Sequence, residues 1–118
     1  MDFWATWCPP CRESVPDIKS LVKKYPSDKF VVLSVSNDDK ESIAREFVEK
    51  HGMTWQHHFD GKEGELTNKF GVEAFPTYIL IDGDSVIRMR IVGTNPQQSI
   101  VGRLKDALKD MPELQASR

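Results

Sequence analysis

The sequence predicts an alternating α/β domain, in which helices flank the strands of a central sheet. Three observations support this fold class. Phe30–Val35 is a continuous apolar run rich in β-branched residues, as in a strand covered on both faces of a parallel sheet. Apolar residues recur at helical spacing on either side of it, and Pro and Gly fall singly between the periodic stretches. We expect one core over residues 1–111 and a flexible tail over residues 112–118.

The first half of the chain predicts strand, helix, strand. Phe3–Ala5 forms a short strand, and a helix runs from about Cys8 to Tyr25, with Pro16 bending it. Phe30–Val35 then takes a place in the middle of the sheet. The buried stripe of the helix consists of Val15, Ile18, Leu21, Val22 and Tyr25.

A second helix and strand follow. Asp38 and Glu41 have the spacing of a capping pair, so they predict a helix start, and Gly52 ends that helix. A short strand near residues 55–59 comes next, and then a short helix over residues 63–70 that is closed by Gly71.

The last part predicts a hairpin and a helix. Thr77–Ile81 and Ser85–Val92 flank the turn at Asp82-Gly83, and the second of these strands alternates apolar and basic residues, as an edge strand does. Asn95-Pro96 caps a final helix, whose apolar face consists of Ile100, Val101, Leu104 and Leu108. The predicted order is β-α-β-α-β-α-β-β-α.

Composition limits the function classes. The hydrophobic fraction of 39% and the charged fraction of 29% are those of a globular protein. A net charge of −2 argues against nucleic acid as a partner. Apolar runs such as Tyr78–Ile81 are far too short to cross a bilayer. The chain opens inside an apolar stretch without a leader, so we expect it to be part of a longer product.

The two cysteines carry the chemistry. They lie three residues apart in Trp7-Cys8-Pro9-Pro10-Cys11, after a strand and at the start of a helix. There the unpaired N–H groups of the helix would stabilise a Cys8 thiolate, which makes Cys8 the attacking thiol. Cys11, one turn further in and more buried, would be the resolving thiol. Pro9 and Pro10 would preset φ for the first helical turn and stiffen the loop.

Two other interpretations of the cysteine pair fit less well. Zinc needs about four ligands, and the neighbouring His57 and His58 lie on alternating sides of a strand, so we predict no metal. An inert disulfide that closes so small a ring would add little stability. We therefore predict redox exchange through the dithiol itself, with no further cofactor.

The residues Asp2 to Arg12, then Pro16, then Phe75-Pro76-Thr77, resemble the thioredoxin superfamily, and most closely its TlpA/ResA-like branch of thiol-disulfide oxidoreductases. The tryparedoxin and nucleoredoxin group shares Trp-Cys-Pro-Pro-Cys and is the second choice. The resemblance implies a thioredoxin fold, with a central mixed sheet flanked by helices. Residues 38–59 are similar to the helix-strand insertion shared by TlpA-like proteins and peroxiredoxins.

The resemblance also implies roles for individual residues. Pro76 would be the cis-proline beside the dithiol, and the backbone of Phe75 would pair with a substrate strand. Asp2 would be a buried acid that helps to move the proton of Cys11. Trp7 would form a lip beside Cys8. Ser14 departs from the ResA-like pattern, which often has a glutamate there, so an acid-tuned mechanism at that position is not expected.

By the same resemblance, the substrates would be protein disulfides, and an upstream protein thiol donor would supply electrons, with the protein acting as a reductase in an exported pathway. The alternatives are a tryparedoxin-like electron carrier to a peroxidase and a redox-inactive peptide-binding module. We expect an extracytoplasmic location, periplasmic or membrane-tethered in a longer precursor, with the cytoplasm as the alternative. The family carries strand and helix material before the first strand seen here, so we expect a truncated, less stable domain.

Overall fold

Five strands and five helices make up the part of the chain that the computed structural model describes, residues 1–93, 99–109 and 111. The strands are β1 (Asp2–Trp4), β2 (Leu33–Ser36), β3 (Gln56–Phe59), β4 (Thr77–Ile81) and β5 (Ile87–Val92). The helices are α1 (Pro9–Glu13), α2 (Val15–Lys24), α3 (Glu41–Lys50), α4 (Glu65–Lys69) and α5 (Ile100–Leu108). Their order is the predicted alternation, with the first predicted helix divided in two.

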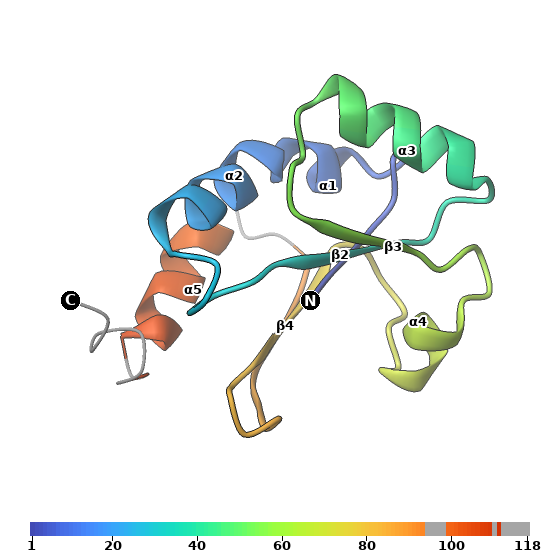
Figure 1. Cartoon of the computed structure of the whole chain (residues 1–118). Helices are drawn as coiled ribbons and strands as arrows, with labels where there is room; N and C mark the ends of the chain where they lie inside the picture. Colours follow the sequence, from blue (N-terminus) through green and yellow to red (C-terminus); the bar gives the residue numbers. More distant parts are fainter. Residues whose placement is uncertain (94–98, 110, 112–118) are drawn as a thin grey trace.

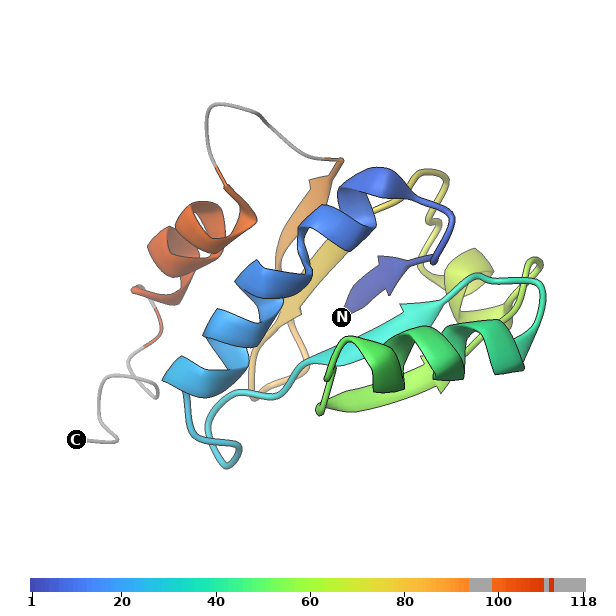
Figure 2. The ribbon, with the colours of Figure 1, turned by 90° about the horizontal axis from the view of Figure 1, so that it is seen from above.

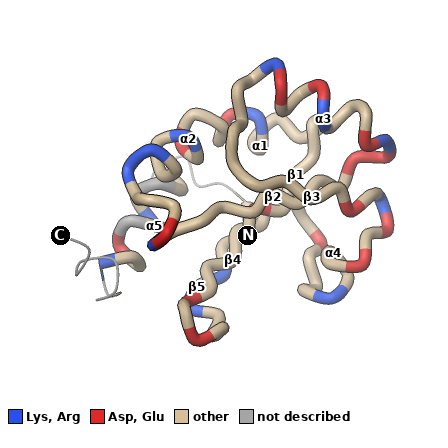
Figure 3. The backbone as a smooth tube through the Cα atoms, in the orientation of Figure 1, with Lys and Arg blue, Asp and Glu red and all other residues tan. Residues whose placement is uncertain are grey.

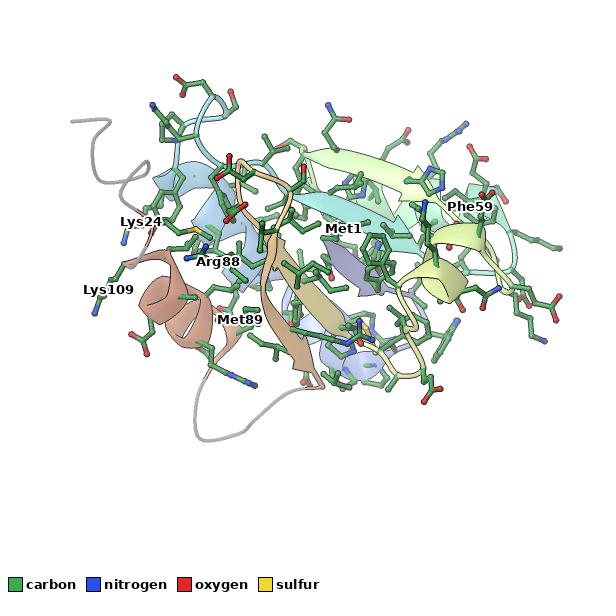
Figure 4. All side chains as sticks on the ribbon, turned by 90° about the horizontal axis from the view of Figure 1, so that it is seen from below. Met1, Lys24, Phe59, Arg88, Met89 and Lys109 are labelled. Carbon is green, nitrogen blue, oxygen red and sulfur yellow. A yellow bond between two sulfur atoms is a disulfide. The ribbon has the colours of Figure 1, made fainter. Side chains whose placement is uncertain are left out.

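The strands form one mixed sheet in the order β3-β2-β1-β4-β5. The strand that leads to the cysteines, β1, lies in the middle, parallel to β2 and antiparallel to β4. Met1 extends this pairing because its carbonyl accepts a hydrogen bond of 2.9 Å from the amide of Ile79, and it lies near the centre of the sheet in Figure 4. Every residue of β1 is buried.

Helices cover both faces of the sheet. Figure 1 shows α1, α2 and α3 above it and α4 below, and Figure 2 shows that α2 lies between α3 and α5. One core cluster joins α2 and α5 to the sheet through Ile18, Leu21, Tyr78, Ile91, Ile100 and Leu104. On the opposite face, Phe3, Val35, Val72 and Ile79 pack with Leu66 and Phe70 from the region of α4. Charged residues follow the outer turns of α2, α3 and α4 (Figure 3).

The helix predicted from Cys8 to Tyr25 is interrupted at Ser14, which separates α1 from α2. Pro16 is the physical reason. It has no N–H to donate to the carbonyl of Arg12, four residues earlier, so the regular ladder stops there. Beyond the break, the amide of Ile18 donates to the carbonyl of Ser14 at 3.0 Å. The sequence predicted one helix with a bend caused by Pro16, and the structure instead has two helices with a break just before this proline.

The predicted capping pair is wrong. The N-cap of α3 is Lys40, whose side chain makes no capping hydrogen bond, and Asp38 lies outside the helix. The carboxylate of Asp38 instead accepts hydrogen bonds from Thr6 and Ser36, which hold it against the carboxyl ends of β1 and β2. These three hydrogen bonds use the carboxylate that the capping pattern of Asp38 and Glu41 would have assigned to the helix.

Other boundaries differ at strand ends. β2 begins at Leu33 rather than Phe30, and Val31 is 61% exposed, although the strand lies in the interior of the sheet as expected, with β1 and β3 as its neighbours. Gly52 and Gly71 follow α3 and α4 with φ of +61° and +63°, a conformation that costs glycine little, so both predicted helix ends are confirmed. The edge position of β5 is also confirmed. The predicted cap at Asn95-Pro96 and the tail over 112–118 lie outside the described residues.

Candidate active site

The cysteine pair lies where β1 ends and α1 begins. Cys8 is the N-cap residue of α1, with extended backbone angles, and its Sγ accepts a hydrogen bond of 3.3 Å from the amide of Cys11. The two residues form a disulfide, with their Cα atoms 5.3 Å apart. A sulfur that caps a helix faces unpaired N–H groups, and these stabilise negative charge on it. This environment favours a thiolate at Cys8 in the reduced protein.

The expectation that Cys11 is more buried than Cys8 is wrong for the disulfide form, because each residue is 4% exposed. Both belong to an apolar cluster with Trp4, Ala5, Val15 and Met53, against which Phe75 packs. The asymmetry between the cysteines comes from hydrogen bonding instead. Only the Sγ of Cys8 accepts from the helix, whereas Cys11 lies inside the first turn.

Pro9 and Pro10 occupy the first positions of α1, where an absent N–H leaves no helical bond unmade. The amides of Cys11 and Arg12 are therefore the first that the helix offers. The amide of Cys11 donates to Cys8 Sγ, and that of Arg12 donates to the carbonyl of Cys8 at 3.1 Å. Because the two prolines have no N–H, the first two amide donors of α1 are those of Cys11 and Arg12, and both donate to Cys8.

The segment before β4 lies beside the cysteines. The Phe75-Pro76 peptide is cis, as the resemblance implies, and Pro76 is fully buried. The ring of Phe75 meets that of Trp7 edge-on, with centroids 5.8 Å apart. Trp7 is 60% exposed, the most exposed aromatic ring described near the cysteines. Trp7 and Phe75 therefore present an apolar surface next to Cys8.

The loop that carries Cys8 is held from two sides. Asp38 accepts hydrogen bonds from the backbone amide of Thr6 at 3.0 Å and from its hydroxyl at 2.6 Å. On the other side, Arg12 Nη1 donates to the carbonyl of Thr6 at 2.8 Å. Asp38 is 2% exposed, so its two hydrogen bonds with Thr6 are partly shielded from water, whereas the bond from Arg12 is exposed. The hydrogen bonds of Thr6 therefore hold the loop that places the sulfur of Cys8 relative to the sheet.

Asp2 is buried in β1, 7% exposed, and its Oδ2 accepts a hydrogen bond of 2.7 Å from Ser34 Oγ. Burial raises the pKa of Asp2 to about 6, against the opposing effects of the Ser34 hydrogen bond and the amino terminus. Of the described hydrogen bonds, none joins Asp2 to a cysteine. Burial, together with the nearby carboxylate of Asp2, also raises the pKa of Tyr78.

His57 and His58, the two histidines considered as metal ligands, have different partners. His57 Nε2 makes a hydrogen bond of 2.9 Å with the carbonyl of Met53, and burial lowers the pKa of His57. His58 faces Asp60 at 3.5 Å. Within residues 1–93, 99–109 and 111, no three His, Cys, Asp or Glu side chains are grouped to hold a metal ion.

Sequence reasoning missed Asp38 and Ser34 as parts of the site. A signal for Asp38 was present, because Thr6 and Asp38 each follow a strand, and parallel strands bring their carboxyl ends to one edge. Ser34 carried no such signal, because it stands within an apolar strand. Its partnership with Asp2 follows from the register that pairs the two residues.

Comparisons with known proteins agree with this geometry. The profile of the Redoxin family matches residues 1–108. The thiol-disulfide oxidoreductase ResA of Bacillus thuringiensis (strain Al Hakam) is 29% identical over 105 residues, which are 89% of this chain and 60% of ResA. The chain thus spans about 60% of the length of the curated relatives it matches.

Solved structures extend the likeness to three dimensions. A Chlorobium tepidum protein, described as a thiol:disulfide interchange protein DsbE, has a TM-score of 0.83 and 31% identity, and the match covers 96% of this chain and 77% of that one. The exposed lipoprotein thioredoxin Etrx1 of Streptococcus pneumoniae has a TM-score of 0.65 and 26% identity, with 89% and 81% covered. The fold is therefore that of these thioredoxin-like proteins. The described part of the chain contains no helix long and apolar enough to cross a membrane.

Proposed function

Because this chain belongs to the Redoxin family, we propose that it is a thiol-disulfide oxidoreductase that exchanges disulfides with protein substrates through Cys8 and Cys11. One observation carries the proposal. Cys8 Sγ caps α1 and accepts the amide of Cys11, while the same two residues can form a disulfide. This arrangement supplies a stabilised nucleophile and a resolving thiol at bonding distance.

In the reduced protein, the thiolate of Cys8 attacks one sulfur of a substrate disulfide. A mixed disulfide forms and the first substrate thiolate leaves. Cys11 then loses its proton and attacks Cys8 Sγ, which breaks the mixed disulfide and releases the second substrate thiolate. The substrate gains two electrons, and the Cys8–Cys11 pair loses them. A thiol-bearing protein donor restores the dithiol by the same steps in reverse.

Asp2 is the proposed acceptor of the Cys11 proton. A buried carboxyl with a pKa of about 6 is largely ionised at neutral pH, yet its proton affinity exceeds that of an exposed aspartate. No described hydrogen bond joins Asp2 directly to Cys11, so an intervening water is the simplest route for the proton.

Substrate binding is assigned to the surface around Trp7, Phe75 and Pro76. Trp7 and Phe75 supply apolar contact area beside Cys8. The buried Pro76 fixes the backbone that precedes β4, and an extended substrate segment would lie along the backbone of Phe75. We also propose that the protein acts as a reductase and that it lies outside the cytoplasm. Its likeness to an exposed lipoprotein thioredoxin supports the location.

Insulin reduction with a small thiol donor tests the activity. The native chain should accelerate the precipitation of insulin, and Cys8→Ser should abolish that acceleration. A native chain that gives no acceleration would instead favour a redox-inactive peptide-binding module.

Trapping tests the two roles. Cys11→Ser removes the thiol that resolves the mixed disulfide, so an extract should yield adducts that are joined through Cys8 and released by reductant. Cys8→Ser is the matched control and should capture little, since the Sγ of Cys11 lacks the capping hydrogen bond that favours a thiolate at Cys8. Equal capture by both variants would contradict the assignment of attacking and resolving thiols.

A further inference from the structure

Two consecutive hydrogen bonds lead from Trp55, just before β3, to the buried carboxylate of Asp2 in β1. The indole Nε1 of Trp55 donates to Ser34 Oγ at 2.8 Å, and Ser34 Oγ donates to Asp2 Oδ2 at 2.7 Å. Ser34 is fully buried and Asp2 nearly so. Trp55 stands one residue before β3, in the segment between β2 and α4. This segment thus reaches the residue assigned above as proton acceptor.

The donors and acceptors of these two hydrogen bonds are fixed by the chemistry of the side chains. An indole N–H can only donate, and a serine hydroxyl carries a single hydrogen. Because Trp55 occupies an acceptor site of Ser34 Oγ, the hydroxyl hydrogen is left for Asp2, which accepts it as a carboxylate. Both donors therefore favour the ionised form of Asp2, whereas burial opposes it.

Building on the function proposed above, we propose that Ser34 and Trp55 are positioning residues for Asp2, and that Trp55 acts through Ser34. Together they hold the carboxylate in place and set the pH above which it can take the proton of Cys11. Trp55 also packs against the cluster that contains Cys8 and Cys11, which fixes its indole in the donating orientation.

Of the described ionisable groups near Asp2, none donates a hydrogen bond to its carboxylate, so this contact comes from Ser34. The Met1 amino group, next to Asp2, acts on it by charge and donates its own hydrogen bond to the carbonyl of Ile79. On β4, Tyr78 has a raised pKa and is neutral at physiological pH, while Asp17 on α2 acts on Tyr78 by charge. Lys29 lines the same hollow as Asp2.

On the β3 side, His57 stacks on Trp55 with ring centroids 5.6 Å apart. Burial lowers the pKa of His57, so it is neutral near pH 7 and brings no charge to these two hydrogen bonds. In the described residues, Ser34 is the one hydrogen-bond donor to the carboxylate of Asp2.

The test is a direct titration of the Asp2 carboxyl by carbon-13 NMR, with Asp2→Asn used to assign the signal. Ser34→Ala should move the midpoint upward by about one pH unit, the usual strength of a hydrogen bond to a charged group. Trp55→Phe keeps an aromatic ring but removes the N–H, so it should give a smaller upward shift. Ser34→Thr should restore most of the native midpoint because it restores the hydroxyl.

The double variant Ser34→Ala/Trp55→Phe should titrate like Ser34→Ala alone, since Trp55 acts only through the hydroxyl. Trp4→Phe is the matched control. It removes an indole N–H from the same apolar cluster, and that N–H has no partner in the described part of the chain. The midpoint of Asp2 should not move in this control.

The pH profile of disulfide exchange provides the second readout, and its acid limb should follow Asp2 upward in Ser34→Ala. An unchanged Asp2 midpoint in Ser34→Ala would overturn the proposal. So would an effect of Trp55→Phe that is equally large with and without Ser34. The titration needs no turnover, so a native chain inactive on insulin would refute the proposed function and leave this inference to be judged by the carboxyl signal.

Discussion

Replacing Asp2 with Asn should stabilise the protein at neutral pH and leave it unchanged in acid. Burial raises the pKa of Asp2 from 3.8 to about 6. The folded protein therefore binds this proton more tightly than the unfolded chain does. The contribution of Asp2 to the free energy of unfolding is highest below pH 4, and this contribution is lost as the pH rises through about 6. A difference of about two units corresponds to about 3 kcal/mol, and Asn carries no charge to desolvate.

Urea denaturation from pH 4 to pH 8 measures this effect. The free energies of unfolding of the native chain and Asp2→Asn should coincide near pH 4 and diverge by about 3 kcal/mol above pH 6. Asp82→Asn is a control of opposite sign, because hydrogen bonds from Val86 and Asp84 and the charge of Arg88 lower the pKa of Asp82. That variant should be less stable at neutral pH and should lose this deficit in acid. A gain in Asp2→Asn that is equal at every pH would refute the electrostatic reasoning.

Three further predictions concern the redox loop. In the reduced protein, Cys8 should react with iodoacetamide faster than Cys11 and at lower pH, because only its sulfur caps α1; mass spectrometry of the alkylated peptides would show the order. Asp38→Ala should cost about 2–4 kcal/mol in urea denaturation, since it leaves the partly buried donors of Thr6 and the buried hydroxyl of Ser36 without an acceptor, and a loss within error would contradict the role of this carboxylate. Trp7→Ala should raise the KM for a protein substrate roughly tenfold with little change in kcat, since removal of an exposed aromatic contact costs about 1–2 kcal/mol, and steady-state kinetics separates the two constants.

Much of the fold could be predicted from local signals. The pattern of apolar residues predicted β1 and β4. The glycines after α3 and α4 predicted the ends of these helices, because glycine adopts a positive φ easily. Pro16 predicted a bend in the first helix, because a missing N–H acts on the carbonyl four residues earlier, and the structure has a break between α1 and α2 at this place. Cys8 and Cys11 lie between the end of β1 and the first turn of α1, so the sequence also predicted that the two cysteines lie at a helix start.

The resemblance to the thioredoxin superfamily supplied what local signals could not. The cis peptide before Pro76 agrees with it, although its residues alone favour trans. The resemblance also pointed to Asp2, but it did not say which residues surround that carboxylate. The inference that Cys11 is more deeply buried than Cys8 failed, because the same apolar cluster encloses both sulfurs.

The sequence by itself determined the alternation of strands and helices, the helix start at Cys8, and the proline before β4. These depend on interactions within a few residues, which the order of the side chains specifies directly. Only the tertiary structure decided what Asp2 and Asp38 do. Each carboxylate has a donor 32 residues away, Ser34 for Asp2 and Thr6 for Asp38, and the parallel pairing of β1 with β2 brings these residues together. Strand register is a property of the whole sheet, so no local pattern contains it.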